Sequence, residues 1–523
     1  MGKFAGTVLL CSLLLLTLTG RTQKEYDDPL LNRPLRIEIP VGSDRETYRV
    51  IPCASDGFLL FYKSVETAPE NKVKWYFSLY DKNLQPIWTR GVPLAGDADF
   101  RERHGNGDTL SLFFQTAEPG KAASNTFQLL RVLVRKGGFI LNNGVLPDQA
   151  TLSAFTVTGQ RCFAGLNIRN EQARLMILDL PTGKQEFVTI TGGTHTSFAG
   201  LEADEGDQML TAVIRKQLAK RYWDHYLFRI KSDGTILGET LISPGTPDRQ
   251  LADPKICSIL GSEKFIGGSY VLTSSLTDQQ QKQGSTKSTG LFAARFSGLI
   301  QQRSSFNNYL DLQSAGDLLS EREMMALRKK AMKKNRILPE YSADLNILIH
   351  DIIRHDDQFI VLGETYYLQF HTESFTDFDY YGRPYSNSYS VFDGYRFTNA
   401  IAAAYDASGK LLWDHSMPIR NLLSREPDPK VSLTFIGDAA VLCYLSDGKI
   451  GYKVIRGGET VEKMDYTDVE LSLSDDRLVS ETRSCMVHWY DNYFLCYGYQ
   501  EIKNLSTQGN ETKTVFYCNK VQF

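Results

Sequence analysis

Short apolar segments separated by tight polar turns recur along the whole chain. Eight times, two apolar segments are joined by a turn of Asp, Asn, Gly or Glu, and a third segment then turns through Asp or Gly into a more polar fourth. The first pair is clear in YRVIPCASDGFLLFYKS (48–64) and in CMVHWYDNYFLCYGYQ (485–500). These turn residues accept the backbone angles of tight hairpins, and such short apolar runs are typical of strands. The pattern predicts eight antiparallel units of four strands each.

The two ends of the chain indicate how these units are arranged. The eighth unit stops at Phe523 after three strands, whereas LRIEIPV (35–41) is a strand without a unit of its own. If this N-terminal strand completes the last unit, the sheets close into a ring with only short, protected edges. We therefore predict an all-β fold, an eight-bladed β-propeller closed by its N-terminal strand. Seven blades are the alternative, because the second unit is the least regular.

One repeat carries a resemblance to a known superfamily. The segment AAYDASGKLLWDHSMP (403–418) resembles, with one residue fewer between the Asp and the Gly, the D-x-x-x-G-K-x-x-W motif of quinoprotein-like propellers, which carry repeats of the pyrroloquinoline-quinone type. A weaker copy is YDKNLQPIWTRGVPL (80–94), and most other units lack the tryptophan. The resemblance implies a propeller fold. Because that superfamily contains both eight-bladed dehydrogenases and non-enzymatic propellers of outer-membrane assembly, it does not choose an activity.

The N-terminus predicts export. It has a lysine, an apolar run at 4–18, and then small and polar residues, which is the order of a signal peptide. We predict a signal peptide over residues 1–22, with an uncleaved anchor as the alternative. Residues 23–523 are then a single β-propeller domain without a transmembrane segment. We expect it in the periplasm or outside the cell, where it could also associate with the outer membrane.

Composition and motifs narrow the chemistry. The net charge of −3 and the pI of about 6.3 argue against a nucleic-acid partner, which would require a basic face. The sequence has no serine-hydrolase elbow, no P-loop and no H-E-x-x-H motif. The segment DFDYYG (377–382) begins like a calcium loop but lacks its later acidic ligands. We therefore predict no metal and no cofactor, and the sequence identifies no catalytic residue.

Three insertions interrupt the repeats, at 276–290, 316–337 and 370–398. The first is rich in Gln, Ser, Thr and Lys, and we expect a flexible hairpin tip. The second has a capping box at Ser320 and Glu323 and predicts one surface helix. That helix, at 320–334, either packs on the rim of the propeller or makes a peripheral contact with a partner or an anionic membrane surface.

The third insertion is dense in aromatic residues. It lies in the sixth unit, and residues 375–399 hold nine Phe or Tyr in twenty-five positions. We expect a protruding β-arm that turns near Gly382, Arg383 and Pro384. Either the arm folds over a neighbouring blade and half-buries its rings, or it exposes them as a contact surface. In the second case the predicted binding residues are Tyr380, Tyr381, Arg383, Tyr385, Tyr389, Phe392 and Tyr395.

Three cysteines near the C-terminus suggest a disulfide bond in the last unit. Cys485 and Cys496 are equidistant from the turn at 490–491, and Cys518 follows on the next strand. In an exported protein, the spacing predicts a disulfide between Cys485 and Cys496, with buried free thiols as the alternative.

Two hypotheses about function remain. The first is an exported, non-enzymatic bacterial propeller that binds a protein or glycan at the cell envelope. The alternative is a carbohydrate-active hydrolase or lyase whose acids, drawn from several blades, converge at the mouth of the ring. The missing catalytic motifs favour the first hypothesis, and a convergence of Asp, Glu and His in one pocket would favour the second.

Overall fold

The computed structural model describes residues 35–42, 47–116, 125–169, 172–190, 195–204, 208–219, 222–273, 287–318, 343–378, 380–505 and 512–523, and the single positions 322, 325, 326 and 329. The predicted signal peptide, most of the 276–290 insertion and nearly all of the predicted helix at 320–334 lie outside these residues. Within the described part of the chain, no helix has the length and apolar character needed to cross a membrane.

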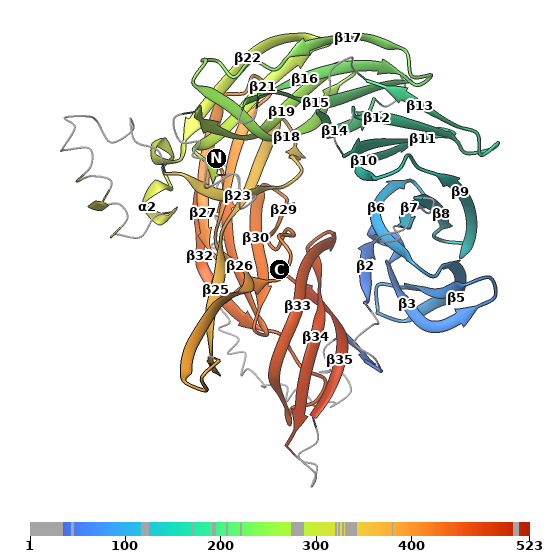
Figure 1. Cartoon of the computed structure of the whole chain (residues 1–523), viewed down its shortest axis with the longest axis vertical. Coiled ribbons are helices and arrows are strands. Elements are labelled where there is room, and N and C mark those ends of the chain that lie inside the picture. Colours follow the sequence, from blue (N-terminus) through green and yellow to red (C-terminus); the bar gives the residue numbers. More distant parts are fainter. Residues whose placement is uncertain are drawn as a thin grey trace, which may run out of the picture.

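Antiparallel strands form seven sheets of four strands and one sheet of seven strands (Figure 1). The first two sheets contain β2 (Arg49–Pro52), β3 (Phe58–Ala68), β4 (Lys72–Tyr80) and β5 (Pro86–Ala95), then β6 (Ala98–Asn106), β7 (Thr109–Thr116), β8 (Thr126–Leu133) and β9 (Gly138–Val145). The next two contain β10 (Ala150–Thr158), β11 (Arg161–Ile168), β12 (Arg174–Asp179) and β13 (Gln185–Thr189), then β14 (Thr196–Ala203), β15 (Met209–Ala219), β16 (Tyr222–Lys231) and β17 (Ile236–Leu241).

The remaining four-stranded sheets contain β18 (Arg249–Leu260), β19 (Glu263–Leu272), β21 (Gly290–Ser297) and β22 (Ile300–Asn308), then β29 (Ser432–Ile436), β30 (Ala439–Ser446), β31 (Lys449–Arg456) and β32 (Glu459–Asp468), and finally β1 (Arg36–Pro40), β35 (Thr512–Gln522), β34 (Tyr493–Asn504) and β33 (Asp476–Tyr490). The seven-stranded sheet contains β20 (Lys287–Ser288), β23 (Leu345–Ile349), β25 (Gln358–Phe378), β26 (Pro384–Asp406) and β27 (Leu411–Pro418), with β24 (Ile353–His355) beside β25 and β28 (Leu423–Ser424) beside β26.

The sheets follow one another around a common centre, so the prediction of an all-β propeller is confirmed (Figure 1). The irregular second repeat forms a complete four-stranded sheet, β6 to β9. The N-terminal β1 pairs with the C-terminal β35, with Ile37 opposite Cys518. The helical elements with described bounds are the 3-10 turns η1 (Ala54–Asp56) and η3 (Tyr309–Asp311) and the helix α2 (Ala315–Leu318). The four described positions of the predicted helix, 322, 325, 326 and 329, are also helical and exposed.

The polar turns join the strands as the sequence pattern predicts. In the repeat with the quinoprotein-like motif, a carboxylate oxygen of Asp406 accepts the backbone N–H groups of Ser408 and Lys410, at 2.8 and 3.0 Å. Gly409 adopts a φ of 82°, which costs glycine little because it lacks a Cβ. Asp406 and Gly409 therefore turn β26 into β27.

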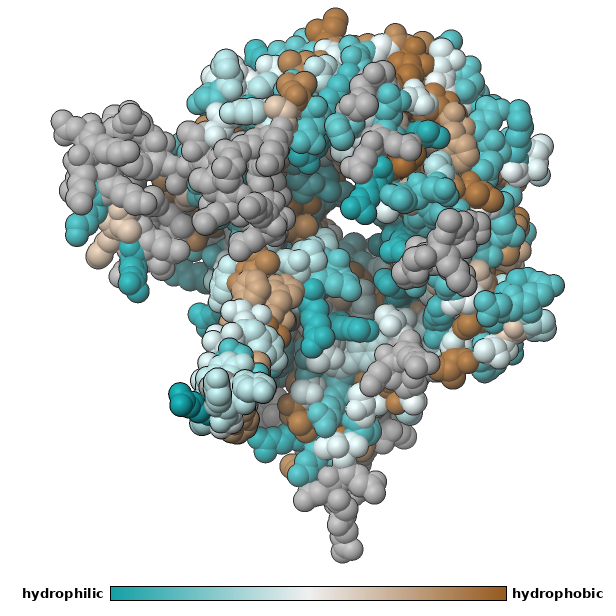
Figure 2. All heavy atoms as spheres, in the orientation of Figure 1, coloured by the Kyte–Doolittle hydropathy of each residue, from teal (hydrophilic) through white to brown (hydrophobic). Residues whose placement is uncertain are grey.

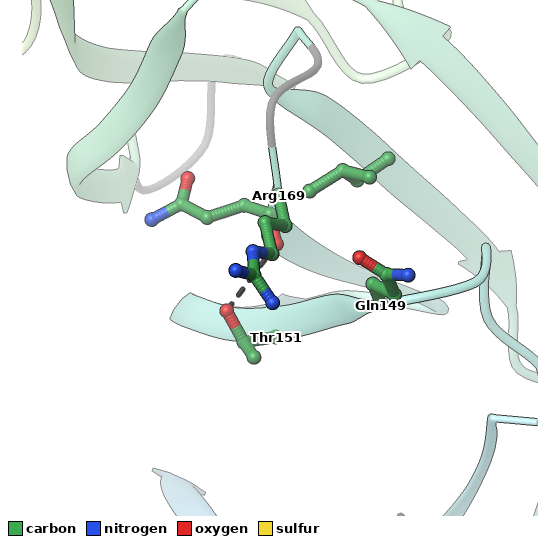
Figure 3. Close-up of a pocket in the computed structure, with 5 residues that line it drawn as sticks. Gln149, Thr151 and Arg169 are labelled. Carbon is green, nitrogen blue, oxygen red and sulfur yellow. Dashed lines mark hydrogen bonds between the residues drawn. The ribbon is translucent and has the colours of Figure 1, made fainter. Parts of the chain in front are cut away.

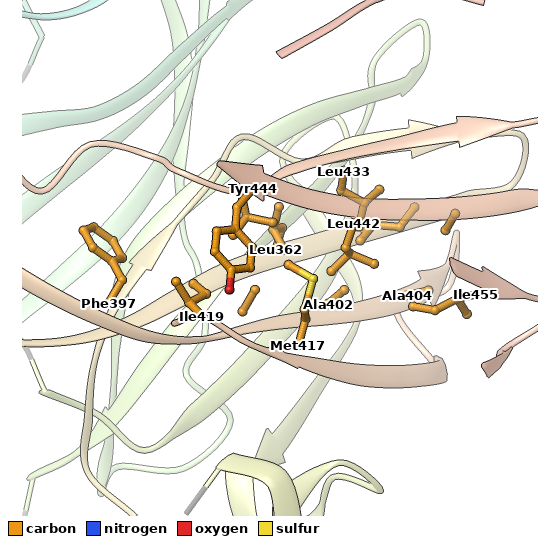
Figure 4. Close-up of a cluster of buried hydrophobic side chains, with 14 of the residues drawn as sticks. Leu362, Phe397, Ala402, Ala404, Met417, Ile419, Leu433, Leu442, Tyr444 and Ile455 are labelled. Carbon is orange, nitrogen blue, oxygen red and sulfur yellow. The ribbon is translucent and has the colours of Figure 1, made fainter. Parts of the chain in front are cut away.

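Apolar side chains pack between neighbouring sheets rather than in one central core. Figure 4 shows the cluster between the seven-stranded sheet and the sheet of β29 to β32. Leu362 and Ala402 contribute from the first sheet, and Leu433 and Leu442 from the second. Such burial contributes about 25 cal/mol per Å² of apolar surface removed from water. Each sheet is thus held by its neighbours.

A buried ionic cluster links the sheets of β14–β17 and β18–β22. Asp204, just after β14, forms an ion pair with Lys264 of β19, whose Nζ lies 2.6 Å from one carboxylate oxygen, and its other oxygen accepts a hydrogen bond from Arg229 of β16. Asp204 is 2% exposed and Lys264 is 0% exposed. Arg229 also donates to the Thr211 hydroxyl at 2.7 Å. The Asp204 carboxylate is therefore shared by two largely buried cations, and the Glu202 carboxylate, 3.5 Å from Lys264 Nζ, also pairs with the lysine.

The predicted pairing of Cys485 with Cys496 needs correction. The hairpin turns at 491–492, one residue later than expected, and together with an irregularity in the ladder of β33 and β34 this places Cys485 opposite Tyr497 and Cys496 opposite Met486. Neighbouring positions on a strand point to opposite faces, so this offset of one residue separates the two thiols. All seven cysteines from Cys53 to Cys518 are free in the structure.

Candidate functional site

The aromatic insertion forms a two-stranded ribbon that projects from the propeller (Figures 1 and 2). We call residues 370–392 the arm. Its strands are the continuations of β25 and β26, and they pair from Phe370 opposite Phe392 to Phe378 opposite Pro384. All described residues from 370 to 390 are exposed. The turn lies at 380–383, as the sequence predicts, and Gly382 there has a φ of 73°.

The exposure decides between the two expectations for the arm. Tyr380 is 97% exposed and Tyr381 is 80% exposed, while Tyr385 and Tyr389 are 45% and 50% exposed. An arm folded onto a neighbouring blade would bury these rings, so that alternative is wrong for the described residues. Large exposed aromatic side chains gathered on one element are uncommon on a protein surface without a partner.

One face of the arm combines aromatic rings with carboxylates. Directly opposite residues of an antiparallel pair share a face. This tyrosine face consists of His371, Glu373, Phe375, Asp377, Tyr385, Asn387, Tyr389 and Val391. The Tyr385 hydroxyl donates to Asp377 at 3.1 Å, and the Tyr389 hydroxyl donates to Glu373. These bonds hold both tyrosine rings in place.

A histidine and two carboxylates form the inner end of the tyrosine face. His371 Nδ1 contacts Asp393, the extra residue at the irregularity of the ribbon, and Nε2 lies 3.3 Å from Glu373. Hydrogen bonds to Asp393 and Glu373 raise the pKa of His371. The hydrogen bond from the Tyr389 hydroxyl, followed by the contact with His371, lowers the pKa of Glu373. The carboxylates of this face are therefore already engaged within the arm.

The opposite face has no charged side chain. This hydroxyl face consists of Phe370, Thr372, Ser374, Thr376 and Phe378 on β25, and of Phe392, Ser390, Ser388, Ser386 and Pro384 on β26. The rings of Phe370 and Phe392 are 5.4 Å apart at its inner end. Among the described residues, no hydrogen bond engages the six hydroxyl groups between the two ends.

The predicted binding residues therefore occupy different places on the arm. Tyr385 and Tyr389 lie on the tyrosine face, and Phe392 lies on the hydroxyl face. Tyr380, Tyr381 and Arg383 form the tip. Tyr395 is half-buried at the base, where its ring is 5.5 Å from that of Tyr366. The structure brings together on one face only two of the seven predicted residues.

A second group of polar residues, missed at the sequence level, converges from four sheets on a cavity of about 480 Å³. The cavity is lined by Glu102 of β6, Lys255 of β18, Leu348, Ile349, His350, Asp351, Ile353 and Leu362 of the seven-stranded sheet and its loops, and Pro429, Val431, Ser432 and Leu433 at β29. We call it the hub cavity. Burial raises the pKa of Glu102, and the nearby carboxylate of Asp351 adds to the effect.

A buried carboxylate orients the histidine of the hub cavity. His350 Nε2 lies 2.6 Å from Glu364 Oε1, which also accepts the backbone N–H groups of Lys430 and Val431 at 2.8 Å each. Glu364 is fully buried. The contact with this carboxylate fixes the orientation of the His350 ring at the cavity. No spacing in the sequence could signal this cavity, because its members come from distant blades.

A smaller cavity of about 360 Å³ lies at one end of β10 and β11 (Figure 3). It is lined by Gln149, Thr151, Asn167, Ile168 and Arg169. The Thr151 hydroxyl donates to the Asn167 carbonyl at 3.2 Å. Among the described residues that line it, none carries a carboxylate or an imidazole.

Comparison with known proteins does not assign a family. No protein-family model matches the chain, and no curated protein matches it. Similar solved structures include the polysaccharide lyase Uly1 (TM-score 0.39, 11% identity, covering 93% of this chain and 98% of that one). A second is the β-propeller domain of the Trilobed protease from Pyrococcus furiosus (TM-score 0.35, 8% identity, covering 80% of this chain and 97% of that one). A third is the periplasmic gluconolactonase PpgL of Pseudomonas aeruginosa (TM-score 0.35, 10% identity, covering 81% of this chain and 96% of that one). The scores and identities are low, so these likenesses carry no argument about activity.

Proposed function

We propose that this chain is a non-enzymatic β-propeller scaffold that binds a protein partner through its arm. The exposed tyrosine face is the observation that carries the proposal. Tyr385 and Tyr389 present large amphipathic surfaces whose orientation is fixed by hydrogen bonds to Asp377 and Glu373. Rigid tyrosines give contact area at a low entropic cost, and they are enriched in interfaces between proteins.

The chemistry of the arm favours a protein over a glycan. Among the described residues of the arm and its base, Glu373, Asp377 and Asp393 have carboxylates that could accept sugar hydroxyls, and each already accepts a hydrogen bond from a neighbouring side chain. The outer edges of β25 and β26 pair with no other strand over residues 370–378 and 384–392 within the described structure. Open backbone edges of this kind accept an extended protein segment as an added strand.

We further propose that the chain is exported to the cell envelope and that it forms an eight-bladed ring. The order of residues in the N-terminal segment supports export. The eight sheets, and the pairing of β1 with β35, support eight blades closed by the N-terminal strand.

A site-specific crosslink tests the binding proposal. A photo-crosslinking residue is placed at Asn387, between the two tyrosines on the same face, and the chain is expressed in its native envelope. We expect a discrete protein adduct that is lost in the double variant Tyr385→Ser/Tyr389→Ser. The matched control is Tyr222→Ser, which removes an exposed tyrosine of β16 in another blade. The adduct partner is then purified and must bind the wild-type chain directly. A carbohydrate adduct, or an adduct that survives the double variant, would refute the proposal.

The hub cavity supports a second candidate function, acid–base catalysis on a carbohydrate. The supporting observation is the convergence of Glu102, Lys255 and the Glu364-oriented His350 in one cavity. A glycan panel is incubated with the wild-type chain, Glu102→Gln and His350→Gln, and release of new sugar ends is measured. Activity lost in both variants and kept in His195→Gln, an exposed histidine elsewhere, would support catalysis. No activity on any glycan would rule against it.

A further inference from the structure

The hydroxyl face of the arm has a symmetric pattern. Along β25 it presents Phe370, Thr372, Ser374, Thr376 and Phe378, a sequence that is the same in both directions. The facing residues of β26 are three serines flanked by Phe392 and Pro384. The centre of both rows is the pair of Ser374 and Ser388. Apolar ends and a hydroxyl middle therefore lie at equal distances on either side of one point.

We propose that this face packs against the same face of a second copy of this chain, in the antiparallel direction. A twofold axis in the plane between the two ribbons, passing over Ser374, places Phe370 of one copy on Phe378 of the other. The same rotation places Phe392 of one copy on Pro384 of the other copy, and Ser374 of one copy on Ser374 of the other. Every apolar group then meets an apolar group and every hydroxyl meets a hydroxyl, which is what a twofold interface requires of a surface.

Charge and size both favour this occupant. The hydroxyl face carries no charge, so two copies do not repel each other there. The tyrosine face carries Glu373 and Asp377, and would bring like charges together if it stacked on itself. Serine and threonine are small, so the two ribbons can approach to the spacing of packed sheets, about 10 Å or less. Their hydroxyl groups, unused within the described chain, can bond across the interface.

The size of the face sets the strength of the association. Nine residues at about 3.3 Å each, across two strands about 5 Å apart, give about 300 Å² per copy. Stable interfaces bury about 800 Å² on each partner, so the pair dissociates on dilution and forms where the chain is concentrated. The arrangement rests on the proposed function, in which the arm is an interface. It leaves both tyrosine faces outward, so a dimer would offer two partner sites and bind with avidity.

A charge swap at the axis tests the arrangement. Sedimentation velocity over a concentration series is measured for the purified chain and for Ser374→Lys and Ser374→Glu. Because the axis sets residue 374 against its own copy, each variant places like charges together, and we expect the dissociation constant to rise at least about tenfold. A one-to-one mixture of the two variants places Lys against Glu and should restore dimers at least as stable as the wild type. All these positions are exposed, so folding is expected to be unchanged.

The control is Asn387→Lys, a similar change on the tyrosine face, which should leave self-association as in the wild type. A wild-type chain that stays monomeric up to about 1 mM, the concentration at which binding is worth about 4 kcal/mol, overturns the proposal. So does loss of dimers in Asn387→Lys that equals the loss in Ser374→Lys, or a mixture that fails to restore them. The two proposals fail separately, because Ser374 variants leave the tyrosine face intact for the partner crosslink, and Tyr385→Ser/Tyr389→Ser leaves the hydroxyl face intact for dimers.

Discussion

The buried ionic cluster yields a strong prediction about stability. Replacing Asp204 by Asn keeps the shape of the side chain and removes the negative charge that Lys264 and Arg229 share. Asp204 and Lys264 are 2% and 0% exposed, so water cannot replace the lost carboxylate. Removing one partner of a buried ion pair costs about 3–5 kcal/mol, because a charge is left without compensation. Because Glu202 still lies 3.5 Å from Lys264 Nζ, we expect Asp204→Asn to lower the free energy of unfolding by about 3 kcal/mol, the lower end of that range.

Equilibrium urea denaturation followed by tryptophan fluorescence measures the effect. Trp223 reports on the same sheet as Asp204, because it lies on β16. A lower midpoint with an unchanged slope indicates lost stability rather than a changed unfolded state. The control is Lys184→Gln, which removes an exposed ion pair with Glu186 of 2.6 Å and should have no measurable effect.

A second substitution isolates the cause. Lys264→Met, added to Asp204→Asn, removes one of the two cations that lose the Asp204 carboxylate in the first change, the lysine that would otherwise depend on Glu202. We expect the double variant to be at least about 1 kcal/mol more stable than Asp204→Asn alone, the non-additivity of residues in direct contact. A single variant within about 1 kcal/mol of the wild type, or strictly additive effects, would refute the idea that the carboxylate stabilises this junction by neutralising buried charge.

Three further predictions follow from the arm, the cores and the cysteines. The pKa of His371, measured by NMR titration, should lie above the usual value of about 6.5 and return toward it in Asp393→Asn. The contacts of protonated His371 should therefore stabilise the arm fully at pH values below about 6.5. This stabilisation should be lost as the pH rises through the raised pKa of His371. Leu442→Ala should cost about 2–5 kcal/mol in urea denaturation, whereas Leu412→Ala, on an exposed position, should cost little. Burial raises the pKa of the Cys496 thiol, so a thiol reagent should modify it far more slowly in the folded chain than in denaturant.

The repeats were predictable from the sequence because each pair of strands has a recognisable local pattern of apolar segments and polar turns. The polar turns fix where a hairpin reverses, and alternation fixes which side faces a neighbouring sheet. Even the incomplete last unit indicated that residues 35–41 pair with the C-terminal strand, as β1 and β35 do. The position and turn of the arm followed from the same pattern, because the sixth repeat is complete without it.

Other features depend on register or on distant contacts, which local patterns do not determine. Cys485 and Cys496 were expected to face each other, but the hairpin turns one residue later than expected, and after an irregularity near the turn the two cysteines are one residue out of register. The hub cavity joins Glu102, Lys255 and His350 from separate sheets. The shared carboxylate of Asp204 likewise meets Lys264 only when two sheets pack together.

The two faces of the arm were present in the sequence, although counting aromatic residues hides them. In FHTESFTDF (370–378), the odd and even positions separate a hydroxyl row from an acidic and aromatic row, since a strand has a period of two. The number of aromatic residues in a segment is therefore a poor predictor of a binding surface. The alternation of odd and even positions is a better one, because it shows which rings lie on the same face.

The way the arm is anchored bears on how it can act. Its strands continue directly from two fully buried strands of the seven-stranded sheet, where Phe359 and Ile401 lie in one inter-sheet core and Leu362 and Ala402 lie in the next. The hydrogen-bonded ladder runs without a loop from these cores to Phe378 and Pro384. Its register shifts by one residue between Thr365 and Tyr366 and again between Gln369 and Phe370. The arm therefore loses its conformational entropy when the propeller folds, and it does not have to lose it when a partner binds. A ribbon held in this way can present its tyrosine face to a partner at little further entropic cost, which a free loop of the same composition could not do.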